Sequence, residues 1–329
     1  MGAVSLLGLG KYLPETIMTN DDLSRIVDTN DEWIASRTGI RARHVLGKGE
    51  TNTDMGLHAS LAALVEAKLV ASEITHILYA TCSPDEICPA SAFTLSHKLG
   101  VTGLFAMDIN VACSGFLYGL VTARGLIAAE PSAKILLVTS EALTTRLNLH
   151  DRSTCVLFGD GAAAVILAGE SADKGIARVQ DVAVASDGSL GPLLRVGSLP
   201  EKGTYTVGDP VGPEFFVRME GREVFKYAVR HMVAVCNEVL ERNALTMDDI
   251  DLFVPHQANL RIIGAVGAKL GARDDQVFIN VDTCGNTSAA SIPVALAEAR
   301  EKGRLLPGMR VLVTTFGGGL SWSAGLLQF

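Results

Sequence analysis

Short apolar runs alternate with longer, helix-like segments along the whole chain. Runs at residues 74–80, 133–142, 250–256 and 308–318 are almost continuously hydrophobic, without polar alternation. That pattern is typical of strands that are buried on both faces of a sheet. Because a helix-like segment lies between consecutive runs, the pattern predicts α/β architecture with mixed sheets covered by helices.

The apolar pattern occurs twice. Four residues of the segment 108–115 recur in the segment 278–285, and 153–169 and 320–329 both predict strand pairs across a glycine turn. The matches are Ile109 with Ile279, Asn110 with Asn280, Val111 with Val281, and Gly115 with Gly285. This repeat predicts two similar halves, 1–172 and 173–329, and residues 197–214, rich in Gly and Pro, predict a surface excursion.

Composition excludes several classes of protein. With 329 residues, of which 48% are hydrophobic and 19% charged, the chain is typical of a soluble α/β enzyme, and its net charge of −8 argues against a general nucleic-acid binder. The six cysteines show no metal or disulfide spacing, so we expect free thiols, no metal and a cytoplasmic location. We find no signal peptide and no apolar run approaching a membrane span, so we expect no membrane contact.

Cys113 is the first candidate for chemistry. It lies where an apolar run ends on small residues and a helix-like run begins, and a helix N-terminus favours the reactive thiolate. A small buried side chain is an equally good interpretation of this segment alone. His256 ends a strand in the second half, and Asn286 lies in a glycine turn nearly equivalent to that of Cys113. Pseudo-twofold packing would bring the three to one cleft.

Six motifs, in order along the chain, resemble β-ketoacyl-acyl-carrier-protein synthase III, the family of condensing enzymes that start type II fatty-acid synthesis. They are DEWIASRTGIRARH, ACSGF, DRSTCVLFGDGAAAVIL, VPHQANLRII, GNTSAAS and FGGGLSWSAGLLQF. The resemblance implies an acyltransferase of the thiolase fold, five layers in the order αβαβα, as a homodimer that needs no cofactor.

The resemblance also implies the roles of the catalytic residues. Cys113 would accept the acyl group of an acyl-CoA primer, with the N–H groups of Cys113 and Gly318 as its oxyanion hole. His256 and Asn286 would then donate hydrogen bonds to the enolate oxygen that forms when malonyl-acyl carrier protein (malonyl-ACP) loses CO₂. Whether His256 also deprotonates Cys113 stays open at this stage.

Further residues follow from the same resemblance. The residues implied for coenzyme A binding are Trp33, Arg37, Arg152 and Asn259, and those for the acidic carrier protein are Arg222, Lys226, Arg261 and Lys269. Apolar side chains would line the primer pocket: Leu143, Phe158, Leu194 and Phe316. At the gate position, which the partner subunit would supply, short-chain members of the family carry phenylalanine, whereas this chain has Cys88. The smaller side chain predicts tolerance of primers longer than acetyl.

Other activities remain as alternatives. A specialised paralogue that uses an aryl or unusual acyl-CoA starter would carry the same three residues. A biosynthetic thiolase would need a second cysteine near the FGGG segment, but none follows Cys284, and elongating ketosynthases use two histidines. A papain-like hydrolase would lack the two related halves. A non-enzymatic binding module would not need all three residues.

Overall fold

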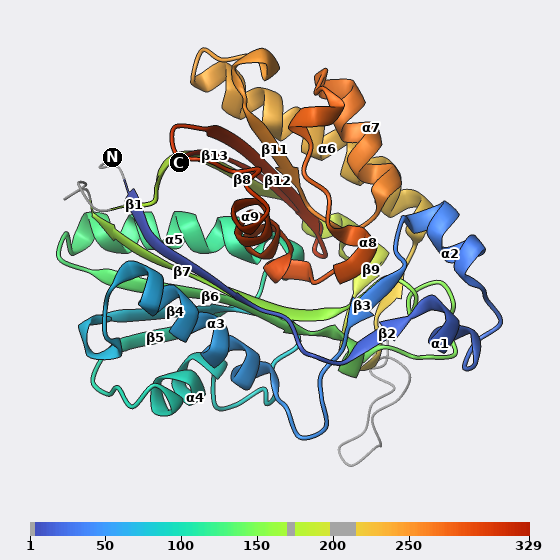
Figure 1. Cartoon of the computed structure of the whole chain (residues 1–329), viewed down its shortest axis with the longest axis horizontal. Helices are drawn as coiled ribbons and strands as arrows, with labels where there is room; N and C mark the ends of the chain where they lie inside the picture. The colour runs from blue at the N-terminus through green and yellow to red at the C-terminus, as the bar shows by residue number, and fades with distance from the viewer. Residues whose placement is uncertain (1–3, 170–174, 198–214) are drawn as a thin grey trace.

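A nine-stranded mixed sheet runs through the computed structural model, which describes residues 4–169, 175–197 and 215–329 (Figure 1). Its strand order is β11-β12-β13-β8-β1-β7-β6-β4-β5. The strands are β1 (Val4–Tyr12), β4 (His76–Ala80), β5 (Phe105–Ile109), β6 (Lys134–Ala142), β7 (Asp160–Gly169), β8 (Ala177–Ser186), β11 (Leu252–Pro255), β12 (Arg310–Gly317) and β13 (Ser321–Gln328).

The strand order shows the predicted internal repeat. Strands β5-β4-β6-β7-β1 form one half and β11-β12-β13-β8 the other, and the halves meet where β1 pairs with β8 at Val4–Leu6. In the second half the equivalent of β5 is reduced to one parallel bridge, between Phe253 and Val277. The predicted boundary near residue 172 lies outside the described residues, as does nearly all of the predicted excursion at 197–214.

Helices complete the five layers that the sequence predicts. Helices α3 (Asn52–Ala67) and α4 (Ser91–Lys98) cover the outer face of the first half, and α6 (Gly221–Arg242) and α7 (Leu260–Leu270) lie outside the second. Between the halves lie α5 (Gly115–Ala129) and α9 (Ser291–Glu301), which contact strands of both (Figure 1). The smaller elements are β2 (Ile17–Thr19), α1 (Asn20–Ser24), α2 (Asp31–Thr38), β3 (Ala42–His44), β9 (Leu194–Arg195), β10 (Arg218–Met219) and α8 (Val281–Cys284).

The uninterrupted apolar runs have the predicted physical cause. In β6 every residue from Ile135 to Ala142 is buried, because α3 covers one face of the strand and α5 the other. One prediction was wrong: residues 153–169 do not form a hairpin. Their only strand is β7, which pairs antiparallel with β6 across a long connection. Residues 320–329 likewise hold a single strand, β13, which forms a hairpin with β12 and not the predicted pair within the segment.

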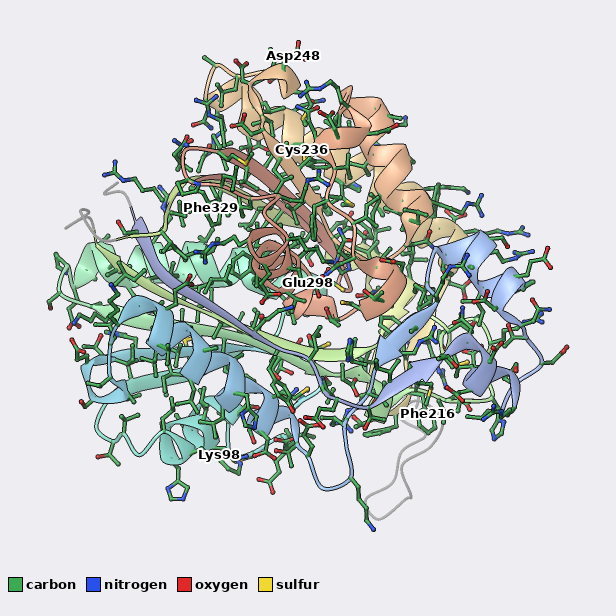
Figure 2. The ribbon with its side chains drawn as sticks, viewed as in Figure 1. Lys98, Phe216, Cys236, Asp248, Glu298 and Phe329 are labelled. Carbon is green, nitrogen blue, oxygen red and sulfur yellow. The ribbon has the colours of Figure 1, made fainter. Side chains whose placement is uncertain are left out.

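Close packing holds the central helices in place. A Cβ atom at Gly115, the first residue of α5, would lie 2.9 Å from the Cβ of Ala80 and 3.1 Å from that of Ala289, so only glycine allows this approach. On α9, the carboxylate of Glu298 is paired with Lys11 of β1 and with Lys302 (Figure 2). These contacts hold α5 and α9 against β4 and β1 of the first half.

One helical stretch bears on the expectation that no run approaches a membrane span. Among the described residues, Ala112–Ala129 is long and apolar enough to cross a membrane by length and composition. Half of it is buried inside the fold, and α5 contacts β4, β6, β7, β8 and β13. Its apolar character therefore has a structural explanation, since it is the core helix between the two halves.

Candidate active site

Cys113 lies in the turn that opens α5, as the sequence predicts. A 3-10 turn, Ala112–Ser114, follows β5 and leads directly into the helix at Gly115. Ala112 adopts a left-handed conformation with φ of 43°, and the Cys113 side chain is 6% exposed. The thiol is therefore held at the start of a buried helix, where the helix dipole favours an anion.

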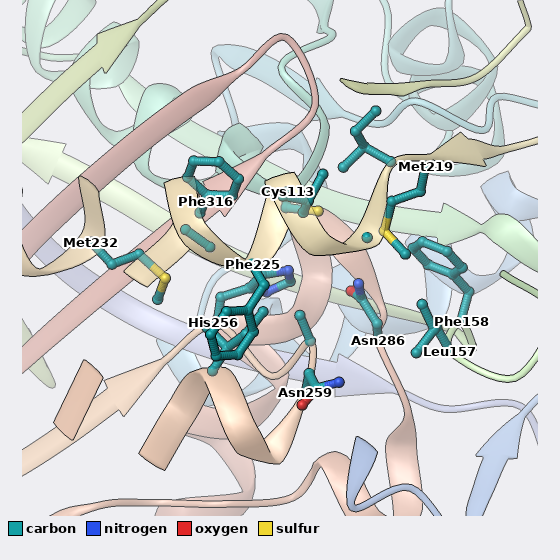
Figure 3. Close-up of a pocket in the computed structure, with 16 residues that line it drawn as sticks. Cys113, Leu157, Phe158, Met219, Phe225, Met232, His256, Asn259, Asn286 and Phe316 are labelled. Atoms are coloured by element: carbon teal, nitrogen blue, oxygen red, sulfur yellow. The ribbon is translucent and has the colours of Figure 1, made fainter. Parts of the chain in front are cut away.

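His256 and Asn286 reach the same cavity from the second half (Figure 3). His256 follows β11, and its backbone N–H donates to the backbone oxygen of Thr314 at 2.8 Å. Asn286 follows α8, and its side-chain Oδ1 accepts from the N–H of Ser288 at 2.8 Å. With Oδ1 occupied, the amide nitrogen of Asn286 is left to donate into the cavity. The structure thus brings together the three side chains that the sequence identified.

Burial keeps the histidine and the thiol uncharged. It lowers the pKa of His256 to about 4, and it raises the pKa of Cys113 to about 12, although the nearby Ser288 side chain acts in the opposite direction. We expected the helix N-terminus to favour a thiolate at rest. Desolvation is the largest cause of the raised pKa of Cys113, so the thiol proton has to leave as the sulfur attacks.

A second cavity meets the first at Cys113. Four of the residues expected around the primer and the oxyanion line it with Cys113, namely Leu143, Phe158, Leu194 and Gly318. Phe316, also expected there, lines the first cavity instead, while Cys88 is exposed in the connection between β4 and α4 and lines neither. The primer pocket is therefore only partly built from the residues named from sequence.

The glycine at the end of β12 packs against Cys113. A Cβ atom at Gly317 would lie 2.8 Å from the Cys113 backbone nitrogen, so glycine is required at this position. Gly318, the next residue, lines the second cavity with Cys113. This places the two N–H groups expected to form the oxyanion hole on adjoining segments.

The residues expected at coenzyme A gather around Trp33. The Trp33 ring has the guanidinium carbon of Arg37 4.7 Å from its centroid and that of Arg152 at 4.6 Å. Asn259 caps α7 by accepting from Arg261 N and donates to Arg37 O. An adenine ring stacked on Trp33 would replace one guanidinium on the indole face.

The basic residues expected at the carrier protein lie on α6 and α7, which pack side by side. All four are exposed: Arg222, Lys226, Arg261 and Lys269. Two neighbouring surface pockets contain them, one with Arg222, Lys226 and Arg261 beside Arg37, the other with Lys226 and Lys269. They form one basic surface next to Trp33.

Sequence reasoning missed several residues of the two cavities. Met219, Phe225 and Met232 line the first, and Cys82 and Ser288 line the second. It also missed Glu141, a fully buried acid whose Oε1 accepts from Ser288 Oγ at 2.9 Å. The signal for Glu141 was available, because an acidic residue near the end of an apolar strand needs hydrogen-bond partners. Among the described residues, no group of His, Cys, Asp and Glu is arranged to hold a metal ion.

A buried cysteine, histidine and asparagine that meet between two pseudo-symmetric α/β halves define a condensing enzyme of the thiolase fold. Models of 3-oxoacyl-[acyl-carrier-protein] synthase III match residues 107–188, and of its C-terminal part residues 240–329. The chain is 56% identical to the β-ketoacyl-[acyl-carrier-protein] synthase III of Nitratidesulfovibrio vulgaris, over 100% of both chains. The chain belongs to the β-ketoacyl-acyl-carrier-protein synthase III family.

Solved structures of the same family agree with this assignment. The synthase III of Aquifex aeolicus VF5 is 41% identical, with a TM-score of 0.91 over 99% of this chain and 100% of that one. That of Thermus thermophilus is 38% identical, with a TM-score of 0.90 over 99% of both chains. The predicted five-layered thiolase fold is confirmed.

Proposed function

We propose that this protein joins an acyl-CoA primer to malonyl-ACP by a decarboxylating Claisen condensation, and so starts fatty-acid synthesis. The products are β-ketoacyl-ACP, CO₂ and free coenzyme A. The observation that carries the proposal is the meeting of Cys113, His256 and Asn286 around one cavity, in a chain 56% identical to a synthase III over its full length.

The first half-reaction loads the nucleophile. Cys113 attacks the thioester carbonyl of the primer, and the coenzyme A thiolate leaves. The N–H groups of Cys113 and Gly318 hold the oxyanion, and one such donor is worth about 2.7–4 kcal/mol in a comparable site. The second cavity receives the acyl chain against the apolar side chains of Leu143, Phe158 and Leu194 in its wall.

The second half-reaction uses the two neutral donors. When malonyl-ACP loses CO₂, the electron pair that remains resides on the thioester oxygen as an enolate. The His256 ring and the Asn286 amide donate hydrogen bonds to that oxygen, and they stabilise the charge only as it forms. The enolate carbon then attacks the acyl-cysteine and releases the Cys113 thiolate.

Binding uses the residues around Trp33 and the basic surface beside them. Trp33, Arg37, Arg152 and Asn259 take the coenzyme A arm. The basic surface on α6 and α7 attracts the acidic carrier protein, because a protein with a net charge of −8 can attract another acidic protein only through a local field.

Incubation with acyl-CoA and then with malonyl-carrier tests the function directly. We expect a mass increment equal to the acyl group on Cys113, followed by β-ketoacyl-carrier as the product after the second substrate is added. Free fatty acid without condensation would contradict the proposal, since that is the outcome of a hydrolase.

We predict that decarboxylation does not depend on pH between pH 8 and pH 5.5. Because the His256 pKa is about 4, the ring stays neutral throughout this range and keeps its role as a donor. The measurement is CO₂ release from malonyl-carrier by a Cys113→Ala protein, which excludes titration of the thiol. A fall of about tenfold centred near the ordinary histidine pKa of about 6.5 would contradict it.

We further propose that the primer pocket accepts chains longer than acetyl, with Cys88 of a second subunit at its gate. Each buried methylene contributes about 0.8 kcal/mol to binding. We predict that octanoyl-CoA is a good primer, and that Cys88→Phe lowers kcat/KM for it about tenfold, in line with the 1–3 kcal/mol cost of overpacking. Acetyl-CoA kinetics of the same variant are the control. A wild-type protein that uses only acetyl-CoA would discard the idea.

A homodimer fits this arrangement. Strand β5 lies at the edge of the sheet and exposes Phe105 and Met107, and the nearby Phe93 and Ile87 are also exposed, Ile87 by 98%. Unpaired edges with apolar side chains favour pairing with another chain. We place this dimer in the cytoplasm, because the described cysteines are all free thiols and its substrates are soluble.

A further inference from the structure

A buried carboxyl group is hydrogen-bonded to a serine that lines the same cavity as the nucleophile. Glu141 is the penultimate residue of β6 and is completely buried, and its Oε1 accepts from Ser288 Oγ at 2.9 Å. The Ser288 side chain lies close enough to Cys113 to lower the pKa of its thiol. Ser288 and Cys113 also line one cavity. Glu141 and Ser288 therefore form a hydrogen-bonded pair, with exchangeable protons, that borders the cavity of the nucleophile.

The other hydrogen bonds of Glu141 decide which of its carboxylate oxygens is open to Ser288. Its Oε2 accepts from Ser83 Oγ at 2.5 Å, from Cys82 N at 3.1 Å and from Thr81 Oγ1 at 3.3 Å. Ser83 Oγ already accepts from a backbone N–H at 2.8 Å, and Thr81 Oγ1 accepts from Ser83 N at 3.1 Å, so each directs its own proton toward Glu141. Oε1 is left to the Ser288 hydroxyl and to a longer contact with the Cys82 thiol, at 3.4 Å.

The thiol needs such a proton acceptor. Burial keeps Cys113 protonated, and the helix N-terminus stabilises a thiolate without taking up a proton. His256, the other ionisable residue of the triad, is a weak base because burial lowers its pKa to about 4. Burial raises the pKa of Glu141, which makes it a stronger base than an ordinary carboxylate.

We propose that Glu141 takes up the proton of Cys113 through the Ser288 hydroxyl during acyl transfer, and returns it when the condensation releases the thiolate. This inference rests on the proposed function and adds a proton store to it. Glu141 touches neither substrate nor the reacting sulfur, so it is a positioning residue for the proton. It also resolves the question that the sequence left open, because His256 is not needed as the base.

The steps balance. As the Cys113 sulfur forms its bond to the primer carbonyl carbon, its proton moves to Ser288, and Ser288 passes its own to Glu141. The coenzyme A thiolate leaves and takes a proton from water. After decarboxylation and attack by the enolate carbon, the bond from Cys113 to the acyl carbon breaks. The thiolate then regains its proton from Glu141 through Ser288.

Several other titratable groups act on the relay. Tyr79 of β4, Cys82 after β4 and Asp160 of β7 interact electrostatically with Glu141, as does Cys113 itself. Burial raises the pKa of each of these three neighbours, to about 6 for Asp160. Asp160 is held by hydrogen bonds from Leu46 N and Thr144 instead of facing Ser288. At neutral pH the tyrosine and the second thiol carry no charge.

Two variants test the relay with a probe that needs no substrate. Alkylation of Cys113 by iodoacetamide at pH 7 reports directly on its loss of a proton. We expect Glu141→Gln and Ser288→Ala each to lower this rate about 100-fold, as for loss of a positioned general base. Acylation by octanoyl-CoA should fall equally with an unchanged KM. Its solvent deuterium isotope effect should disappear in Ser288→Ala.

The two variants separate the relay from other roles. If Glu141 acted only as a nearby negative charge, Glu141→Gln would speed up alkylation, and that result would overturn the proposal. Ser288→Ala keeps the backbone N–H that holds Asn286, so its decarboxylation of malonyl-carrier should persist. A wild-type alkylation rate in Ser288→Ala would also overturn the relay.

Thr139→Ala is the matched control. Thr139 is a buried hydroxyl residue of the same strand, and it donates to Ala163 O outside the relay. Its alkylation rate should match that of the wild type. Slow alkylation in both relay variants, with no acylation by any acyl-CoA in the wild type, would leave the relay standing and refute the proposed function. Normal condensation by the wild type, with wild-type alkylation rates in both variants, would support the proposed function and refute the relay.

Discussion

Replacement of Cys113 by alanine should abolish the acyl-enzyme and lower condensation by at least about 10⁴-fold, the scale seen when a covalent nucleophile is removed. The physical reason is the loss of the only atom that carries the acyl group between the two half-reactions. Decarboxylation of malonyl-carrier should continue, because it depends on His256 and Asn286. Mass spectrometry after incubation with octanoyl-CoA, and CO₂ release from malonyl-carrier, measure the two effects.

Cys236→Ala provides the control for this prediction. Cys236 is a fully buried thiol on α6 that lines neither cavity, and burial raises its pKa to about 12, as it does for Cys113. The control should keep both half-reactions. Covalent uptake of the primer by Cys113→Ala would show that another residue is the nucleophile, and the proposed chemistry would then be wrong.

Replacement of His256 or Asn286 should impair condensation and leave acylation of Cys113 intact. His256→Ala and Asn286→Ala should each lower condensation about 10²–10³-fold, the usual cost of one donor to a developing oxyanion. Acylation of Cys113 should persist in both, since neither side chain holds the primer oxyanion. Single-turnover acylation with octanoyl-CoA and steady-state condensation measure the difference.

An exposed histidine supplies the matched control for the donors. His150→Ala removes an imidazole that lies at the surface and lines neither cavity, so both half-reactions should be kept. If His256→Ala instead lost acylation and alkylation of Cys113, His256 would be the base for the thiol. In that case the relay through Ser288 would be unnecessary.

The local sequence pattern predicted much of the fold. The uninterrupted run of β6 and its counterpart β12 required two covered faces, and the repeat of Ile109–Val111 at Ile279–Val281 required two related halves. The hairpin predicted at 153–169 failed, because Gly159 precedes β7 while Gly161 and Gly169 lie within that strand, and none of them forms a tight turn between two strands. A glycine motif does not by itself show which strands it joins.

The sequence alone determined the two α/β halves, the family and the three side chains, because hydrophobic periodicity and motif order are properties of neighbouring residues. Only the tertiary structure decided the charge states of Cys113 and His256, since desolvation depends on which distant elements cover a group. It also joined Glu141 of the first half to Ser288 of the second, 147 positions apart, at 2.9 Å. No local pattern contains that contact, because it exists only where the two halves pack together.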